Sequence, residues 1–196
     1  NDWRERGRCS KINGGDGMYV AIDPRDNETV ITGYQFGWYT RLGKGPRSEV
    51  RPRDGLGEPA LRYNWNSPVI LSPHNPDIVY FGSNRVYRSM DQGDRWTAIS
   101  PDLTRDDESK QGYAGGDITR DNTGVEVYGT IFAFEESPHR AGLLWAGSDD
   151  GRVHVSEDGG GTWTEVYSDP DDQRPLFDVW FANARRGLAV GAYGLL

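Results

Sequence analysis

Disulfide-forming cysteines, long apolar runs and an excess of positive charge are all missing from this 196-residue sequence, and each absence excludes a class of protein. The single cysteine, Cys9, excludes an internal disulfide framework. No apolar run approaches the roughly 18 residues that cross a membrane as a helix. The 30 acidic residues outnumber the 22 Lys and Arg, and the net charge of −8 argues against a nucleic-acid partner.

The short motifs of several enzyme classes are missing as well. The sequence has no Gly-x-Ser-x-Gly elbow, no Walker-type Gly-Lys-Ser/Thr and no dinucleotide fingerprint, so nucleophilic catalysis and nucleotide binding have no candidate residues. The three histidines, His74, His139 and His154, lack the spacing of a zinc site. We therefore expect neither a metal nor a cofactor. The function of a glycoside hydrolase is not excluded, because it needs a pair of carboxylates and acidic residues are plentiful.

Glycine and aromatic residues are abundant instead. The chain has 26 Gly, 11 Pro, 7 Trp and 10 Tyr, which is typical of many short strands joined by tight turns. Long helices and helix bundles are disfavoured by this composition.

A pattern of two apolar strands around a polar turn recurs four times. Residues 20–33 align with residues 69–82, which lie 49 residues further on. A third copy occupies residues 131–147, and a fourth, weaker copy occupies residues 179–191. A drifting repeat of this length is typical of β-propeller blades, in which four strands take about 40–50 residues. The sequence thus predicts an all-β propeller with blade-like units at about 14–43, 66–103, 129–168 and 176–196.

Two of these units share the turn pattern Ser-x-Asp-x-Gly-x-x-Trp. Its members are Ser89, Asp91, Gly93 and Trp96 in one unit, and Ser156, Asp158, Gly160, Thr162 and Trp163 in the other. The Asp carboxylate accepts backbone hydrogen bonds, Gly supplies a positive φ and Trp packs beneath the turn. We interpret Asp91 and Asp158 as structural, in preference to calcium ligands or catalytic acids.

These turns, together with residues 61–68, 72–76, 82–89 and 99–104, resemble sortilin-like propellers with BNR (Asp-box) repeats. The similarity extends over about residues 12–167, and residues 178–194 are similar to blades of the photosystem II assembly propellers. The resemblance implies a non-enzymatic module that binds a protein, peptide or glycan through loops on one face. It also implies an extracellular or periplasmic location. The alternative is a glycoside hydrolase or lyase with paired carboxylates in a propeller cleft.

Arginines gather in a Gly- and Pro-rich segment, 44–62, of a chain that is otherwise acidic. Such a cluster can hold an acidic ligand on one face of a rigid scaffold. The candidate binding residues are Arg47, Arg51, Arg53 and Arg62, with Trp38 and Trp65 as aromatic partners. Alternatives stay open for both groups of residues. The arginines belong to a solvated loop with local ion pairs, or they pair with the acidic loop at 102–108. The aromatics, with Tyr39 and Tyr63, fill the space between blades.

The acidic loop itself raises the question of a calcium site. Its carboxylates are Asp102, Asp106, Asp107, Glu108, Asp117 and Asp121. Because the Asp-x-Asp-x-Asp-Gly order of a calcium loop is missing, a solvated acidic loop is favoured.

Four units are fewer than the six to ten blades that the resemblance implies. A half ring exposes sheet edges, which propellers avoid by closing. We therefore expect the chain to be part of a longer protein. Two alternatives are that a strand around residues 2–4 completes the last blade, or that the chain pairs with a second copy of itself.

Overall fold

A computed structural model describes residues 11–43, 45–112, 127–171, 173–183 and 185–192. Its strands form three four-stranded antiparallel sheets and one two-stranded sheet, each in chain order. We name these sheets blades 1 to 4. Blade 1 contains β1 (Val20–Ile22), β2 (Val30–Tyr34), β3 (Trp38–Leu42) and β4 (Ser48–Glu49). Blade 2 contains β5 (Val69–Leu71), β6 (Val79–Gly82), β7 (Val86–Ser89) and β8 (Thr97–Ala98). Blade 3 contains β9 (Ile131–Glu136), β10 (Leu144–Ser148), β11 (Arg152–Ser156) and β12 (Thr164–Ser168). Blade 4 contains β13 (Leu176–Asn183) and β14 (Arg186–Gly191).

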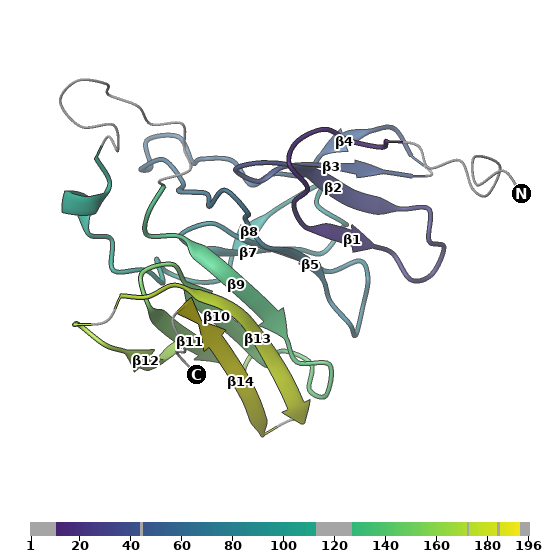
Figure 1. Cartoon of the computed structure of the whole chain (residues 1–196). Helices are drawn as coiled ribbons and strands as arrows, with labels where there is room; N and C mark the ends of the chain where they lie inside the picture. The colour runs from purple at the N-terminus through teal and green to yellow at the C-terminus, as the bar shows by residue number, and fades with distance from the viewer. Residues whose placement is uncertain (1–10, 44, 113–126, 172, 184, 193–196) are drawn as a thin grey trace, which may run out of the picture.

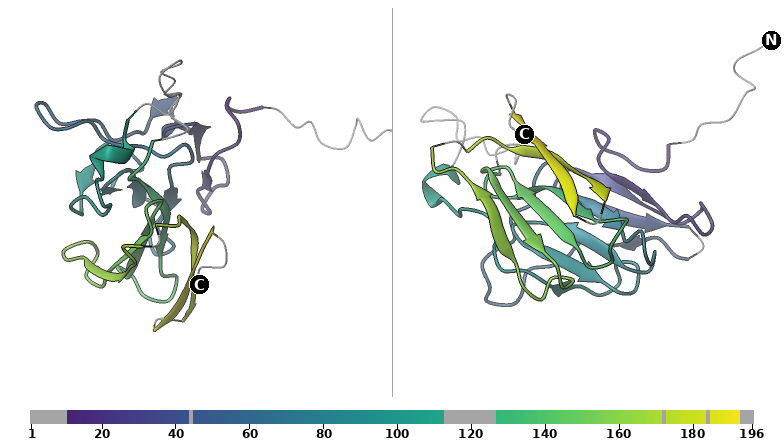
Figure 2. Two further views of the ribbon diagram at one scale, coloured as in Figure 1. Left: turned by 60° about the vertical axis from the view of Figure 1, so that its left-hand side comes forward. Right: turned by 90° about the horizontal axis from the view of Figure 1, so that it is seen from below.

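The blades follow one another in chain order, from the purple to the yellow end of the chain (Figures 1 and 2). Their first strands lie together, since β1 contacts β5, β5 contacts β9 and β9 contacts β13. The all-β class predicted from the repeats is thereby confirmed. η2 (Glu108–Lys110) is a short 3₁₀ helix, and within the described ranges no helix is long and apolar enough to cross a membrane. The strand expected around residues 2–4 lies outside the described residues.

Successive side chains along a strand face opposite sides of the sheet, and one hydrophobic cluster is buried between each two neighbouring blades. Between blades 1 and 2, Ile31 and Tyr39 pack with Val69 and Phe81. Blades 2 and 3 bury a second cluster that includes Tyr80, Val86, Ile131, Phe134 and Leu144. A third cluster between blades 3 and 4 includes Ala133, Leu143, Val179 and Phe181. Since successive side chains of a strand point to opposite faces, each inner blade can bury both of its faces.

The two Ser-x-Asp-x-Gly-x-x-Trp turns have the same hydrogen bonds. In blade 3, Ser156 Oγ donates to Asp158 Oδ1 at 2.8 Å, and the same carboxylate oxygen accepts from the Thr162 backbone at 2.8 Å. These bonds, with one from the Thr162 hydroxyl, lower the pKa of Asp158 to about 2. In blade 2, Ser89 and Asp91 make the equivalent contact at 2.8 Å. The carboxylates of Asp91 and Asp158 are thus hydrogen-bonded within their own turns.

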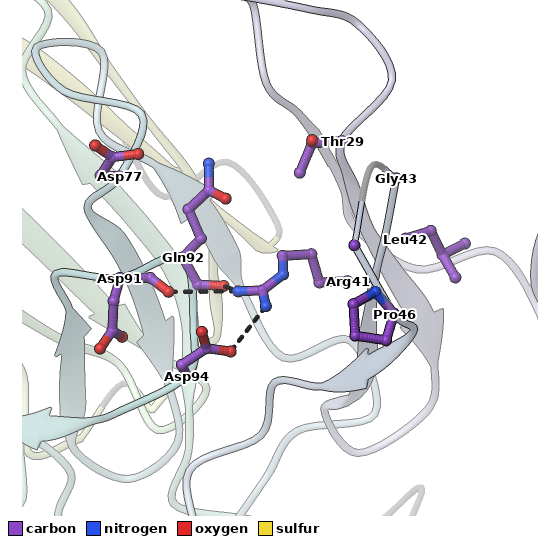
Figure 3. Close-up of a pocket in the computed structure, with 10 residues that line it drawn as sticks. Thr29, Arg41, Leu42, Gly43, Pro46, Asp77, Asp91, Gln92 and Asp94 are labelled. Atoms are coloured by element: carbon purple, nitrogen blue, oxygen red, sulfur yellow. Dashed lines mark hydrogen bonds and ion pairs between the residues drawn. The ribbon is translucent and has the colours of Figure 1, made fainter.

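Each of these turns is also held by an arginine of the preceding blade. Arg41 of β3 donates from Nη1 to the Gln92 carbonyl oxygen at 2.8 Å, and from Nη2 to Asp94 at 2.8 Å (Figure 3). Arg88 of β7 occupies the equivalent strand position and donates to the Gly159 carbonyl oxygen at 3.0 Å. The contact therefore repeats at the first two blade interfaces, and it fixes the position of one blade against the next.

Candidate functional site

The connections at one end of the blades form a continuous surface, which we name the loop face. It consists of residues 35–37, 50–68, 83–85, 99–112 and 149–151. Hydrogen bonds join these segments across blades. Phe36 N donates to the Trp65 carbonyl oxygen at 3.2 Å, and Asn64 Nδ2 reaches Asp149 Oδ2 at 3.3 Å. The connection from blade 1 to blade 2 thus touches blade 3 as well, which gives the loops a rigid base.

A stacked arginine is the most distinctive feature of the loop face. The Arg51 guanidinium carbon lies 4.2 Å from the centroid of the Trp38 ring and 4.0 Å from that of the Tyr63 ring. Within the described part of the chain Arg51 makes no ion pair, and its buried Nε has no hydrogen-bond partner. A pocket of about 440 Å³ opens here, lined also by Arg53 and Asp54. Stacking on two rings holds a cation in place without neutralising it.

Local packing positions the rings of this stack. Tyr63 donates its hydroxyl to the Pro52 carbonyl oxygen at 2.6 Å and meets Phe81 edge to face, with ring centroids 5.7 Å apart. Gly37, which precedes Trp38, has a φ of +70°, and a Cβ there would lie 2.6 Å from the Phe81 ring. Only glycine allows both this turn and the close approach.

A second pocket, of about 360 Å³, adjoins the first, because Arg53 lines both. Among its other lining residues are Glu58, Arg62, Arg85 and Asp102. The side chain of Arg53 is 82% exposed, and its nearest carboxylate oxygen, on Glu49, lies 3.8 Å away. We name the two pockets together the arginine groove. Its charge is mixed: at one end Arg51 has no ion pair within the described residues and Arg53 has only the long, exposed contact with Glu49, and at the other end the charges of Arg62 and its acidic neighbours are closely paired.

Arg62 belongs to the paired end. Its guanidinium forms ion pairs with Asp102 at 2.6 Å and Asp106 at 2.8 Å, and its Nε donates to the Gly129 carbonyl oxygen at 2.9 Å. Among the alternatives predicted for the arginines, pairing with the acidic loop describes Arg62. Its role in ligand binding stays a prediction.

Replacing Arg62 with methionine is expected to lower the free energy of unfolding by about 2 kcal/mol. The side chain is only 18% exposed, so its loss leaves Asp102 without a counter-charge. Arg53→Met is the matched control and is expected to change stability by less than about 0.5 kcal/mol. Urea denaturation measures both, and equal effects at the two positions would contradict the structural role of Arg62.

The remaining predicted residues lie apart from the stack. β4 interrupts the segment 44–62, so Arg47 and Arg51 lie beyond opposite ends of this strand. Arg47 is exposed and donates to Asn13 Oδ1 at 3.2 Å. Trp65 packs edge-on against Phe36, with ring centroids 5.3 Å apart. The structure thus brings together Trp38, Arg51 and Arg53 and leaves Arg47 and Trp65 elsewhere.

The acidic loop is occupied by its own neighbours where the structure describes it. Asp102 accepts hydrogen bonds from Thr104 and Asn84 besides the Arg62 pair. Asp107 caps η2 by accepting from the Ser109 backbone at 3.1 Å. Asp117 and Asp121 lie outside the described residues. Within the described ranges, no group of three or more metal-ligating side chains occurs.

Two half-buried carboxyl groups with a raised pKa were not predicted from the sequence. Burial raises the pKa of Asp149 to about 6, although the Gly129 and Thr130 backbones donate to it at 3.0 and 2.9 Å. Burial, with the nearby charge of Asp178, raises the pKa of Glu135 to about 7. An alignment of residues 147–150 (Gly-Ser-Asp-Asp) with residues 82–85 of blade 2 (Gly-Ser-Asn-Arg) would have pointed to Asp149, because it takes the position of Asn84. No comparable signal marks Glu135.

Comparisons with known proteins bear on the fold. No protein-family model matches the chain, and no curated protein matches its sequence. An ancestral GH74 enzyme matches 86% of this chain and 20% of its own length, with a TM-score of 0.55 and 16% identity. The GH74 xyloglucanase from Xanthomonas campestris matches 82% of this chain and 24% of its own length, with a TM-score of 0.51 and 18% identity.

The chain is a partial β-propeller of about four blades. A structure of YCF48 bound to D1 peptide matches 90% of it and 48% of that protein, with a TM-score of 0.48 and 15% identity. The chain thus spans from a fifth to about half of the length of these propeller proteins.

Proposed function

We propose that this chain is the ligand-binding part of a sortilin-like, BNR-repeat propeller whose arginine groove holds a protein or peptide segment rich in carboxylates. The observation that carries the proposal is the stacked guanidinium of Arg51, which is 4.0 Å from one ring centroid and has no carboxylate partner within the described residues. Arg53 adds a second, exposed cation beside it. A carboxylate that enters the groove would gain charge-assisted hydrogen bonds with little loss of side-chain entropy, because stacking already orders Arg51.

The overall charge of the chain favours a local site. The chain has a net charge of −8, so most of its surface repels an acidic partner. Such a partner is guided to the few places where cations are free. The resemblance to sortilin-like propellers also leads us to propose an extracellular or periplasmic location. Cell fractionation tests that part independently.

Binding of an octaglutamate peptide tests the groove. We expect measurable binding at low ionic strength that weakens about tenfold or more for Arg51→Gln, since one charge-assisted hydrogen bond is worth about 1.5–3 kcal/mol. Binding should also weaken with added salt. An octalysine peptide is the ligand control, and Arg47→Gln, beyond the other end of β4, is the variant control. Equal affinity for both peptides, or loss of binding in Arg47→Gln alone, would reject the groove.

A glycoside hydrolase remains the second candidate because of Glu135. A carboxyl group with a pKa of about 7 is suited to act as a general acid, and Asp178 offers a second carboxyl group beside it for the paired-carboxylate mechanism. Glu135 lies on β9 and Asp178 on β13, two inner strands that contact each other. Reducing sugar released from soluble polysaccharides by the wild type, and lost in Glu135→Gln, would favour this candidate.

A further inference from the structure

Arg85 lines the second pocket of the arginine groove and has no partner for its charge. Its Nε is buried without a hydrogen-bond partner, and its guanidinium forms no ion pair within the described part of the chain. Two carboxylates that line the same pocket, Asp102 and Asp106, pair with Arg62 instead, at 2.6 and 2.8 Å. Arg51 has a buried Nε of the same kind in the adjoining pocket. The groove therefore contains two unpaired arginines of this kind, one in each pocket.

The backbone of Arg85 is held in place by hydrogen bonds to the fully buried Ser83. The Arg85 amide donates to Ser83 Oγ at 3.0 Å, and the Ser83 amide and hydroxyl donate to the Arg85 carbonyl oxygen at 2.9 and 3.0 Å. The side chain of Asn84, between them, donates to Asp102 Oδ2 at 2.7 Å and accepts from the Arg62 amide at 3.2 Å. Arg85 thus projects from a fixed base, which reduces the entropy lost when a ligand binds it.

The blade repeat gives no structural reason for an arginine at this position. The alignment of the blades places Phe36 and Asp150 where blade 2 has Arg85. Both of these side chains contribute to the fold, since Phe36 packs edge-on against Trp65 and Asp150 accepts from the Arg105 amide at 2.7 Å. The guanidinium of Arg85 makes no such contact within the described residues. Its charge is therefore available to a ligand.

We propose that Arg85 binds a second carboxylate, so that the arginine groove recognises two acidic side chains of one peptide segment, one at Arg51 and one at Arg85. This inference rests on the proposed function, and it narrows the ligand to a segment with two carboxylates at a defined spacing. The two subsites are continuous, because Arg53 lines both pockets. An extended chain rises by about 3.3 Å per residue, so the separation of the two guanidinium groups sets the spacing that fits.

Serine octapeptides with capped ends test the two subsites, in competition with fluorescent octaglutamate at low ionic strength. One set carries two glutamates separated by one to four serines, and the reference peptide carries one glutamate. We expect at least one spacing to bind about tenfold or more tightly than the reference, because a second charge-assisted hydrogen bond is gained. Arg85→Gln should abolish this gain and should change the affinity of the reference peptide by no more than about twofold.

Two further variants are controls for charge and position. Arg95→Gln removes the same charge from the same blade, since Arg95 follows β7 as Arg85 precedes it, and its side chain is 89% exposed. It should retain the gain from the second glutamate. Glu58→Gln removes a carboxylate that lines the second pocket, so it should strengthen binding of the two-glutamate peptide. Thermal melts followed by circular dichroism check that the variants fold, and the spacing series in the wild type needs no substitution.

Equal affinity for one and two glutamates at every spacing would overturn the proposal, and so would a gain that Arg85→Gln retains. An equal loss in Arg95→Gln would also overturn it, because net charge would then explain the gain. In each of these cases, weaker octaglutamate binding in Arg51→Gln would leave the proposed function standing. Failure of the wild type to bind any of the peptides, octaglutamate included, would overturn both.

Discussion

Trp163→Ala is expected to lower the free energy of unfolding by about 3–5 kcal/mol, as loss of a large packed aromatic side chain usually does. The Trp163 ring packs against the cluster between blades 2 and 3, and its Nε1 donates to the Ile99 carbonyl oxygen at 2.7 Å. The substitution removes both the ring and this bond between blades. Urea denaturation followed by circular dichroism measures the change.

Trp163→Phe separates the two contributions. It keeps an aromatic ring but removes the donor, so the expected loss is smaller, with about 1 kcal/mol from the hydrogen bond. A loss below about 1 kcal/mol for Trp163→Ala would show that the turn is not a packed part of the interface.

Glu135→Gln is expected to stabilise the protein at high pH and to leave it unchanged at low pH. Because the pKa of Glu135 is raised to about 7 in the folded state, ionisation opposes folding. The wild type therefore loses stability as the pH rises from the unfolded pKa toward about 7, and the variant lacks this loss. At about 1.36 kcal/mol per pKa unit, the gain above pH 7 is up to ~3 kcal/mol.

The comparison requires unfolding free energies of both proteins at about pH 5 and pH 8. The neighbours that raise the pKa of Glu135 are Asp178 and Glu136, so Asp178→Asn should reduce the pH-dependent difference without removing it. A Glu135→Gln effect that is equal at the two pH values would show that Glu135 ionises normally.

Much of the fold could be predicted because local chemistry repeats with the blades. Hydrophobic residues and flanking turns mark the second and third strands of several blades, so β2 (30–34), β6 (79–82) and β11 (152–156) can be recognised in the sequence. The outer strands β4 and β8 could not be recognised, since each has two residues and no buried side chain. β3 was missed because Trp38 and Arg41 face different environments, and no alternation is evident in the sequence.

The candidate site was only partly predictable, for a geometric reason. The composition of residues 44–62 indicates a cationic segment, but not that β4 divides it or that Arg62 turns toward Asp102. The stack of Arg51 between Trp38 and Tyr63 depends on contacts across 12 or more residues of sequence. Such contacts are set by the packing of blades 1 and 2, which no local pattern encodes.

The arginine contact between blades determines where an added blade would keep the same hydrogen bond to its neighbours. Since Arg88 stands where Arg41 stands and Gly159 accepts where Gln92 accepts, the second blade can both receive and offer the same bond. A tandem duplication of this blade would find its connection already matched on both sides. Val155 occupies the corresponding position in blade 3, so a duplicate inserted after that blade would lack the bond. An added copy of blade 2 would thus keep this bond at both of its interfaces, whereas a copy added after blade 3 would not.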